Sequence, residues 1–143
     1  MRMMRDERRA FRLPRGSWRP LGRAIVELAL ARVRLTADHS QHLLKAKRTH
    51  RAPCSALTKK QARLVDQVAF AIPRAADRVP WRADCLVQAL AGERWLRRRG
   101  IAAQIIIGVK KDAKVPIDAH AWLDVGGQVV TGGDIADYTP LAD

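Results

Sequence analysis

One cysteine is placed where a helix could activate it as a nucleophile. Cys85 follows Asp84 at the start of a helical pattern that continues to about Arg99 and stops at Gly100. Asp is a favoured N-cap residue, so we expect Asp84 to begin the helix and Cys85 to lie in its first turn. A thiol there lies at the positive end of the helix dipole, which stabilises the nucleophilic thiolate. A free cysteine is also a common structural residue, and that interpretation stays open.

A histidine that could serve as the base follows on a strand-like segment. His120 belongs to residues 119–125, which alternate as a strand would. A histidine on a strand is usually structural, but beside a thiolate it is the group that accepts and returns a proton near neutral pH. Asp124 lies on the same strand about 13 Å away at roughly 3.3 Å per residue, too far to orient the imidazole. We leave Asp118 outside the site.

Asp134 is the carboxylate that we assign to orient this histidine. If residues 126–128 form a three-residue loop, the chain returns with Asp134 opposite His120. If only the two glycines turn, Ala119 faces Asp134, and a bulge in the glycine pair at 132–133 would be needed to correct the register. Either route brings together a Cys85, His120 and Asp134 triad, in the order found in several cysteine enzymes.

Helical periodicity dominates the chain before these residues. A first helix is predicted over about residues 21–46, with a break near Thr36 and Asp38. Thr58 and Gln61 form a plausible capping box for a second helix, which Pro73 ends or turns. The third is the Cys85 helix, which has a small face suited to packing on a sheet. The spacing predicts that Ile25, Leu28, Ala29, Arg32 and Leu35 share one face of the first helix, and that Cys85, Ala89 and Gly92 form the small face of the third.

Strand periodicity follows Gly100. Residues 104–109 are rich in β-branched side chains, which suits a central strand, and residues 119–125 and 129–131 predict two more strands. Helices first and a meander last predict an α+β fold, with N-terminal helices and the Cys85 helix packed on a small antiparallel sheet. We expect a basic irregular segment over residues 1–20 and one domain over 21–143, helical over 21–99 and sheet over 101–134.

The composition limits the classes of function. The formal charge of +13 on 143 residues favours an acidic partner, although an arginine-rich composition accounts for it equally well. No apolar run approaches the roughly 20 residues of a membrane span, and no signal peptide is evident, so we expect a cytoplasmic protein with reduced thiols. We expect no cofactor. His39, His42, His50 and Cys54 match no strong zinc pattern, so no metal site is assigned.

From Pro80 onward the chain resembles the lasso peptide biosynthesis B2 proteins, which are leader peptidases of the transglutaminase-like cysteine protease superfamily. The similarity is carried by Cys85 opening a helix, the strand GIAAQIIIGVKK, and the strand HAWLDV followed by Asp134. It implies a papain- or transglutaminase-like core in which Cys85 attacks the peptide bond between leader and core of a ribosomal precursor peptide. It also implies that His120 acts as base and Asp134 orients it, through an acyl-enzyme. The implied partners are the precursor, a leader-binding B1 protein and the macrolactam-forming cyclase.

Two other functions stay open. The same triad would serve an acyltransferase or amidase, which passes the acyl group to an acceptor other than water. A basic binding protein for nucleic acid or an acidic partner would need neither Cys85 nor His120; we favour the peptidase and expect no nucleic-acid partner, since no RNA-binding aromatic signature is present.

Overall fold

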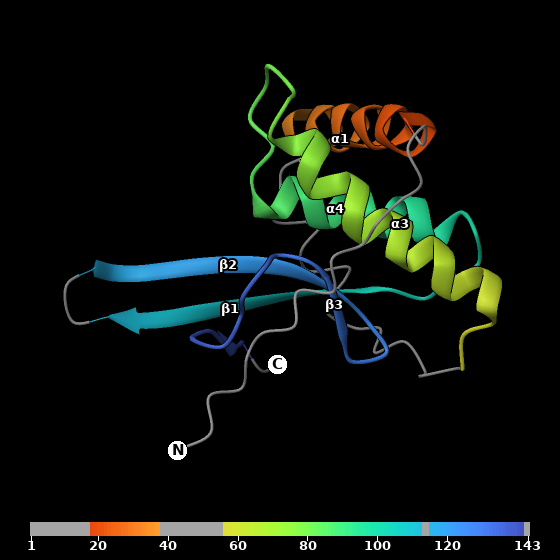
Figure 1. The fold of residues 1–143 in the computed structure, drawn as a ribbon. Helices are drawn as coiled ribbons and strands as arrows, with labels where there is room; N and C mark the ends of the chain where they lie inside the picture. Colours follow the sequence, from red (N-terminus) through yellow and green to blue (C-terminus); the bar gives the residue numbers. More distant parts are fainter. Residues whose placement is uncertain (1–17, 38–55, 113–114, 142–143) are drawn as a thin grey trace.

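Three helices precede a small antiparallel sheet in the described part of the chain (Figure 1). The computed structural model describes residues 18–37, 56–112 and 115–141. The helices are α1 (Trp18–Ala37), α3 (Lys59–Ala76) and α4 (Cys85–Arg97). The strands are β1 (Gln104–Asp112), β2 (Val115–Val125), β3 (Gln128–Thr131) and β4 (Thr139–Pro140). This order confirms the predicted α+β fold.

Local signals fix where α3 begins. Thr58 is its N-cap, and the side chains and backbones of Thr58 and Gln61 form both bonds of the predicted capping box. Pro73 was predicted to end the helix or to begin a turn. It lies instead inside the last turn of the helix. The helix continues to Ala76, and the carbonyl of Pro73 still accepts from the backbone N–H of Asp77. Pro73 lacks only the N–H that would bond to the carbonyl of Ala69, and the helix continues despite this loss.

The first helix begins at Trp18, three residues before the predicted start, and its described part ends at Ala37. The prediction of an irregular segment over residues 1–20 is wrong at residues 18–20, which are helical, and residues 1–17 and the rest of the predicted helix lie outside the described residues. Its buried face differs from the predicted one, because Ile25 is exposed and the charged Glu27 is buried. The Glu27 carboxylate is paired with Arg23 on α1 and with Arg94 on α4, at 2.8 and 2.9 Å. A buried carboxylate of this kind is tolerated when it is fully paired.

The sheet has the strand order β3-β2-β1-β4, and every pair is antiparallel. In the long β1–β2 hairpin Ile105 faces Leu123 and Gly108 faces His120. Gly126 and Gly127 both have positive φ and form a two-residue turn, so Val125 pairs with Gln128. The connection from β3 to β4 runs from one edge of the sheet to the other and must therefore cross β2 and β1.

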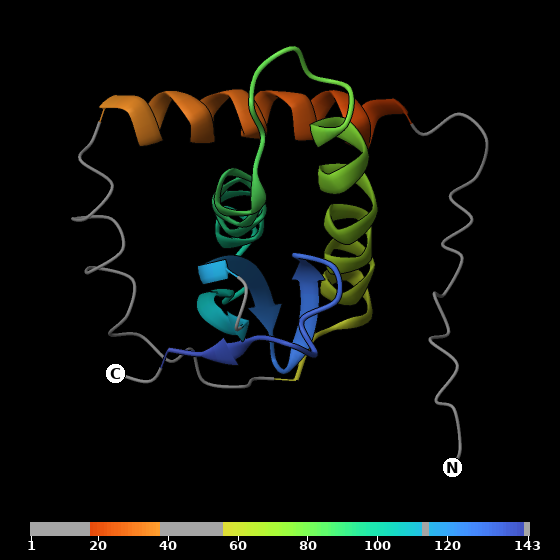
Figure 2. The same cartoon turned by 90° about the vertical axis from the view of Figure 1, so that its left-hand side faces the viewer.

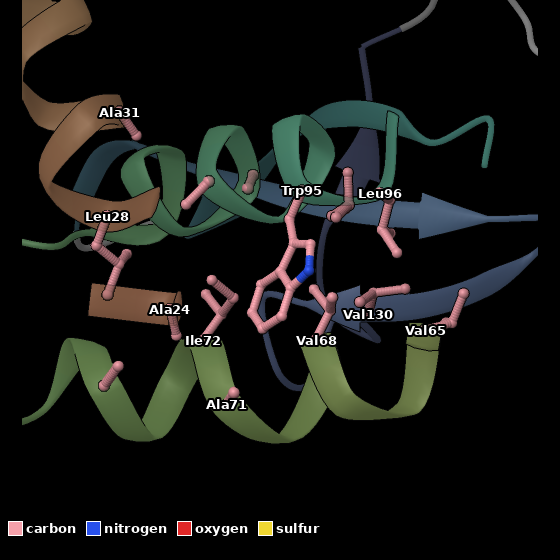
Figure 3. Packing of buried hydrophobic residues seen from close by; sticks show 14 of the residues in the cluster. Ala24, Leu28, Ala31, Val65, Val68, Ala71, Ile72, Trp95, Leu96 and Val130 are labelled. Carbon is pink, nitrogen blue, oxygen red and sulfur yellow. The ribbon is translucent and has the colours of Figure 1, made fainter. Parts of the chain in front are cut away.

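The helices stack on one face of the sheet. Figure 2 shows α1 lying across α3 and α4, with the sheet on the far side of α4. Apolar side chains from all three helices meet in one core with Leu123, Val125 and Val130 of the sheet (Figure 3). None of the described helices is long and apolar enough to cross a membrane. The core therefore fixes the position of α4, and with it Cys85, relative to the sheet.

Candidate functional site

Cys85 is the first residue of α4, as the sequence predicts. Asp84 is the N-cap, with extended backbone, and its carboxylate accepts from the backbone N–H of Val87 at 3.2 Å. The side-chain amide of Gln88 donates to the carbonyl of Ala83 at 2.9 Å, which ties the same turn to the preceding residues. Cys85 is a free cysteine of intermediate exposure. Its thiol thus lies on a well-formed first turn and is reachable from solvent.

The small face of α4 packs directly on the sheet. A Cβ atom on Gly92 would lie 2.7 Å from Leu123 Cδ2 and 3.4 Å from Val68 Cγ1. Ala89, on the same face, is fully buried. This confirms the predicted close approach, because only a glycine at position 92 lets helix and strand come this near.

The contact of Gly92 with Leu123 also sets the level of Cys85 along β2. In Figure 1 α4 and β2 run in the same direction. From Gly92 back to Cys85 the helix covers about 10 Å at roughly 1.5 Å per residue. From Leu123 back to His120 the strand covers about 10 Å at roughly 3.3 Å per residue. We therefore expect Cys85 and His120 to lie at about the same level of the sheet.

The imidazole of His120 points to the other face of β2. Side chains alternate along a strand, so His120 shares its face with Trp122, whereas Leu123 faces α4. The His120 and Trp122 rings lie 6.3 Å apart and the His120 and Tyr138 rings 4.9 Å apart. His120 Nε2 lies 2.6 Å from the carbonyl oxygen of Gly132. Since a carbonyl only accepts, Nε2 carries the proton, and Nδ1 is the basic nitrogen of the neutral ring.

The connection from β3 to β4 covers this second face. The backbone of Trp122 lies against Gly132, and its ring lies against Gly108, whose Cβ atom would be 2.7 Å from the ring. Trp122 is consequently 2% exposed although it lies outside the main core. Lys110 of β1 holds the connection through an ion pair to Asp137 at 2.9 Å.

Asp134 forms no hydrogen bond or ion pair with the imidazole among the described contacts. The two-residue turn is followed by a register shift opposite Leu123 and Asp124, which restores the pairing of Leu123 with Thr131. If that register continued beyond Thr131, Asp134 would lie level with His120. The structure therefore follows the predicted two-residue turn, but the register shift lies before the glycine pair at 132–133 rather than at it. However, β3 ends at Thr131, and Asp134 Oδ1 accepts from the backbone N–H of Ala136 at 3.0 Å.

The other two aspartates have structural partners. Asp124 Oδ1 accepts from the backbone N–H of Gly127 at 2.9 Å and closes the β2–β3 turn. Asp118 Oδ2 accepts from the hydroxyl of Tyr138 at 2.8 Å. The hydrogen bond to this carboxylate raises the pKa of Tyr138 above 10.0. Sequence reasoning did not single out Tyr138, because nothing in the pattern indicates that the chain crosses back to His120.

The described residues contain no group of three or more histidine, cysteine or acidic side chains that could hold a metal. The four residues weighed as a zinc pattern, from His39 to Cys54, lie outside the described part. The described site thus contains the partly exposed Cys85 at the N-terminus of α4. It also contains the imidazole of His120 on β2, whose Nε2 is oriented by its hydrogen bond to Gly132.

Comparison with known proteins gives two matches. The model of a family described as the transglutaminase-like superfamily matches residues 24–143. The microcin J25-processing protein McjB of Escherichia coli is 40% identical over 50 residues, which are 35% of this chain and 23% of that protein. The aligned part is thus less than a quarter of that relative. No solved structure matches the chain.

Proposed function

The chain belongs to the transglutaminase-like superfamily, and on that premise we propose that it is a cysteine peptidase that processes a ribosomally made lasso precursor peptide. The observation that carries the proposal is the free, partly exposed Cys85 on the capped first turn of α4. The partial match to a microcin-processing protein supports peptide processing as the role. A separate leader-binding B1 protein and a cyclase acting on the freed core belong to the same proposal.

In the proposed reaction Cys85 Sγ attacks the carbonyl carbon of the bond that joins leader to core. The imidazole of His120 takes the thiol proton and returns it to the leaving amine, which frees the core and leaves the leader as a thioester on Cys85. A water molecule, deprotonated by the same imidazole, then hydrolyses the thioester and restores the thiol. Asp134 orients the ring by replacing the Gly132 carbonyl as the acceptor of the Nε2–H. The backbone N–H of Cys85 is our candidate for the oxyanion donor.

The geometry of His120 is the most demanding part of this proposal. The reaction needs a ring nitrogen within hydrogen-bond distance of Sγ. In the structure Nε2 is bonded to Gly132, and the ring lies on the face of β2 away from α4. Nδ1 is the nitrogen left for the thiol, so the proposal requires the His120 ring to approach Cys85 when the precursor binds.

Mass spectrometry of a candidate precursor, incubated with and without a leader-binding partner, tests the proposal. Hydrolysis gives two fragments whose masses sum to the precursor plus one water, whereas acyl transfer adds the acceptor in place of water. We expect Cys85→Ala and His120→Ala each to reduce turnover by about a thousandfold or more while the far-UV circular dichroism is unchanged. If His120→Ala cleaves at the wild-type rate, the imidazole has no catalytic role.

A basic binding protein is the second candidate, and one observation favours it. Cys85 lies on α4 at one face of β2, whereas the His120 ring points to the other face, and the chain carries a formal charge of +13. This function predicts binding that falls steeply with salt and is indifferent to Cys85→Ala. Alkylation separates the two candidates: an activated Cys85 reacts with iodoacetamide at about pH 6 faster than a model thiol, and an inert one does not.

A further inference from the structure

A cationic cavity lies at the far end of α4 from Cys85. Its volume is about 880 Å³, which is at the upper end of the usual size of ligand pockets. The N-terminal parts of α1 and α3 and the C-terminal end of α4 form its walls. The cationic side chains that line it are Arg19, Arg23, Lys60, Arg63 and Arg99.

Most of the cationic side chains of this cavity form no ion pair within the described part of the chain. None of the described residues that line it is a carboxylate, and among the described ion pairs only one involves a lining cation, that of Arg23 with Glu27. Arg19, Lys60, Arg63 and Arg99 form none among the described residues. Like charges gathered around one cavity repel one another and destabilise the fold, and they attract an anionic ligand.

The remaining walls identify the kind of anion. Pro20 and Leu64 supply a partly exposed apolar surface, whereas Trp95 and Ile101 are only 4% and 1% exposed. Inorganic phosphate would leave this apolar surface unused. Stacking of a nucleobase needs an exposed aromatic ring, which the buried Trp95 does not offer. A ligand that matches this lining carries both carboxylates and apolar groups on a flexible chain, as an acidic peptide does.

We propose that this cavity binds an acidic segment of the peptide substrate, with an apolar side chain of that segment against Pro20 and Leu64. The proposal rests on the function proposed above. From Cys85 to Trp95 the helix covers about 15 Å at roughly 1.5 Å per residue. An extended peptide spans that distance with about five residues at roughly 3.3 Å each. The acidic segment therefore lies at least about five residues from the bond that is cleaved.

The chain offers a matched pair of variants to test this. Lys60 and Arg99 line the cavity, whereas their neighbours Lys59 and Arg98 do not. The double variants Lys60→Gln/Arg99→Gln and Lys59→Gln/Arg98→Gln remove the same charge from adjacent positions. Both are made in the full chain with Cys85→Ala, and circular dichroism checks that each folds. The probes are a fluorescein-labelled peptide of glutamate and leucine, its glutamine and leucine analogue, and a labelled single-stranded oligonucleotide.

We expect the acidic peptide to bind, the neutral analogue to bind at least about tenfold more weakly, and Lys60→Gln/Arg99→Gln to lose at least about tenfold in affinity. Lys59→Gln/Arg98→Gln should change affinity less than about threefold. Equal losses in the two variants would mean that overall charge, not the cavity, attracts the peptide. Tighter binding of the oligonucleotide would identify a nucleic-acid surface, and no binding of the peptide would overturn the site.

A cleavage assay in the Cys85-containing chain separates this inference from the proposed function. With a precursor that is cleaved, Lys60→Gln/Arg99→Gln should raise KM about tenfold and leave kcat within about twofold, because the cavity binds substrate away from the reacting bond. A fall in kcat with unchanged KM would contradict the inference while leaving the peptidase intact. Peptide binding without any cleavage would preserve the cavity and remove the peptidase.

Discussion

Removal of the Glu27 carboxylate should destabilise the protein more than any single surface ion pair would. The Glu27 side chain is 1% exposed, and it pairs with Arg94, which is 16% exposed, and with Arg23, which is 39% exposed. In Glu27→Ala, Arg23 turns to solvent at little cost, whereas Arg94 is left largely buried without a partner. Breaking a buried pair in this way costs about 3–5 kcal/mol. Because Arg94 keeps some access to water, we expect about 3 kcal/mol.

The prediction is measured by urea unfolding followed by fluorescence, since the chain has four tryptophans. A loss of about 3 kcal/mol is a large part of the roughly 5–15 kcal/mol that stabilises a domain, and it should lower Tm by about 10 °C at this chain length. Asp137→Ala is the control, because Asp137 is 72% exposed and its partner Lys110 is 37% exposed in their 2.9 Å pair. That change should cost less than about 1 kcal/mol.

A double variant shows whether pairing is the cause. Replacing a whole buried pair by apolar side chains is often neutral, so Glu27→Leu/Arg94→Leu should be more stable than Glu27→Leu alone. If the two single losses add in the double variant, Glu27 and Arg94 do not stabilise each other. A loss below about 1 kcal/mol in Glu27→Ala would likewise refute the reasoning, because it would mean that Arg94 finds water.

Three further changes test other parts of the fold. Gly132→Ala should cost about 3 kcal/mol in urea unfolding, because Gly132 has φ +114° and its Cβ atom would overlap Trp122; a loss under about 1 kcal/mol would mean that the β3–β4 connection lies elsewhere. The only tyrosine, Tyr138, should titrate by ultraviolet absorbance with a pKa above 10.0, and Asp118→Asn should bring that pKa back toward the ordinary value. Because the folded pKa is the higher one, this hydrogen bond stabilises the fold below about pH 10 and is lost as pH rises through the folded pKa; an unchanged titration in Asp118→Asn would remove that bond. Thr58→Ala should cost about 1 kcal/mol through loss of the capping box, and no loss would mean that α3 begins elsewhere.

Signals that lie within a few residues of each other predicted the fold well. The N-caps at Thr58 and Asp84 are where the sequence places them, because a cap depends only on side chains within one turn. Gly100, with φ +71°, follows the end of α4 as predicted. The sequence offered only that Pro73 ends α3 or begins a turn, whereas it lies inside the last turn, because a proline removes a single bond to the preceding turn and the helix can continue past it.

Features that depend on distant residues could not be predicted. The pair of Glu27 with Arg94 joins residues 67 positions apart, so periodicity alone assigned Ile25 to the buried face. The partner of His120 Nε2 is a backbone carbonyl, and any residue type at position 132 would provide one. The two alternatives for the β2–β3 turn differ by one residue, and only the packing of Val130 and Thr131 beneath the helices decides between them.

The close packing of α4 indicates which part of the site has to change if thiol and imidazole are to meet. Gly92 leaves no room between α4 and Leu123, so Cys85 cannot shift far without disrupting the core. His120 is held by Gly132 and covered by the β3–β4 connection, whose ties to the sheet include the exposed Lys110–Asp137 pair. An exposed pair contributes at most about 1 kcal/mol, far less than burial of the apolar residues under α4. The peptidase proposal therefore depends on rearrangement of residues 132–138 and the strand they cover, with α4 kept in place.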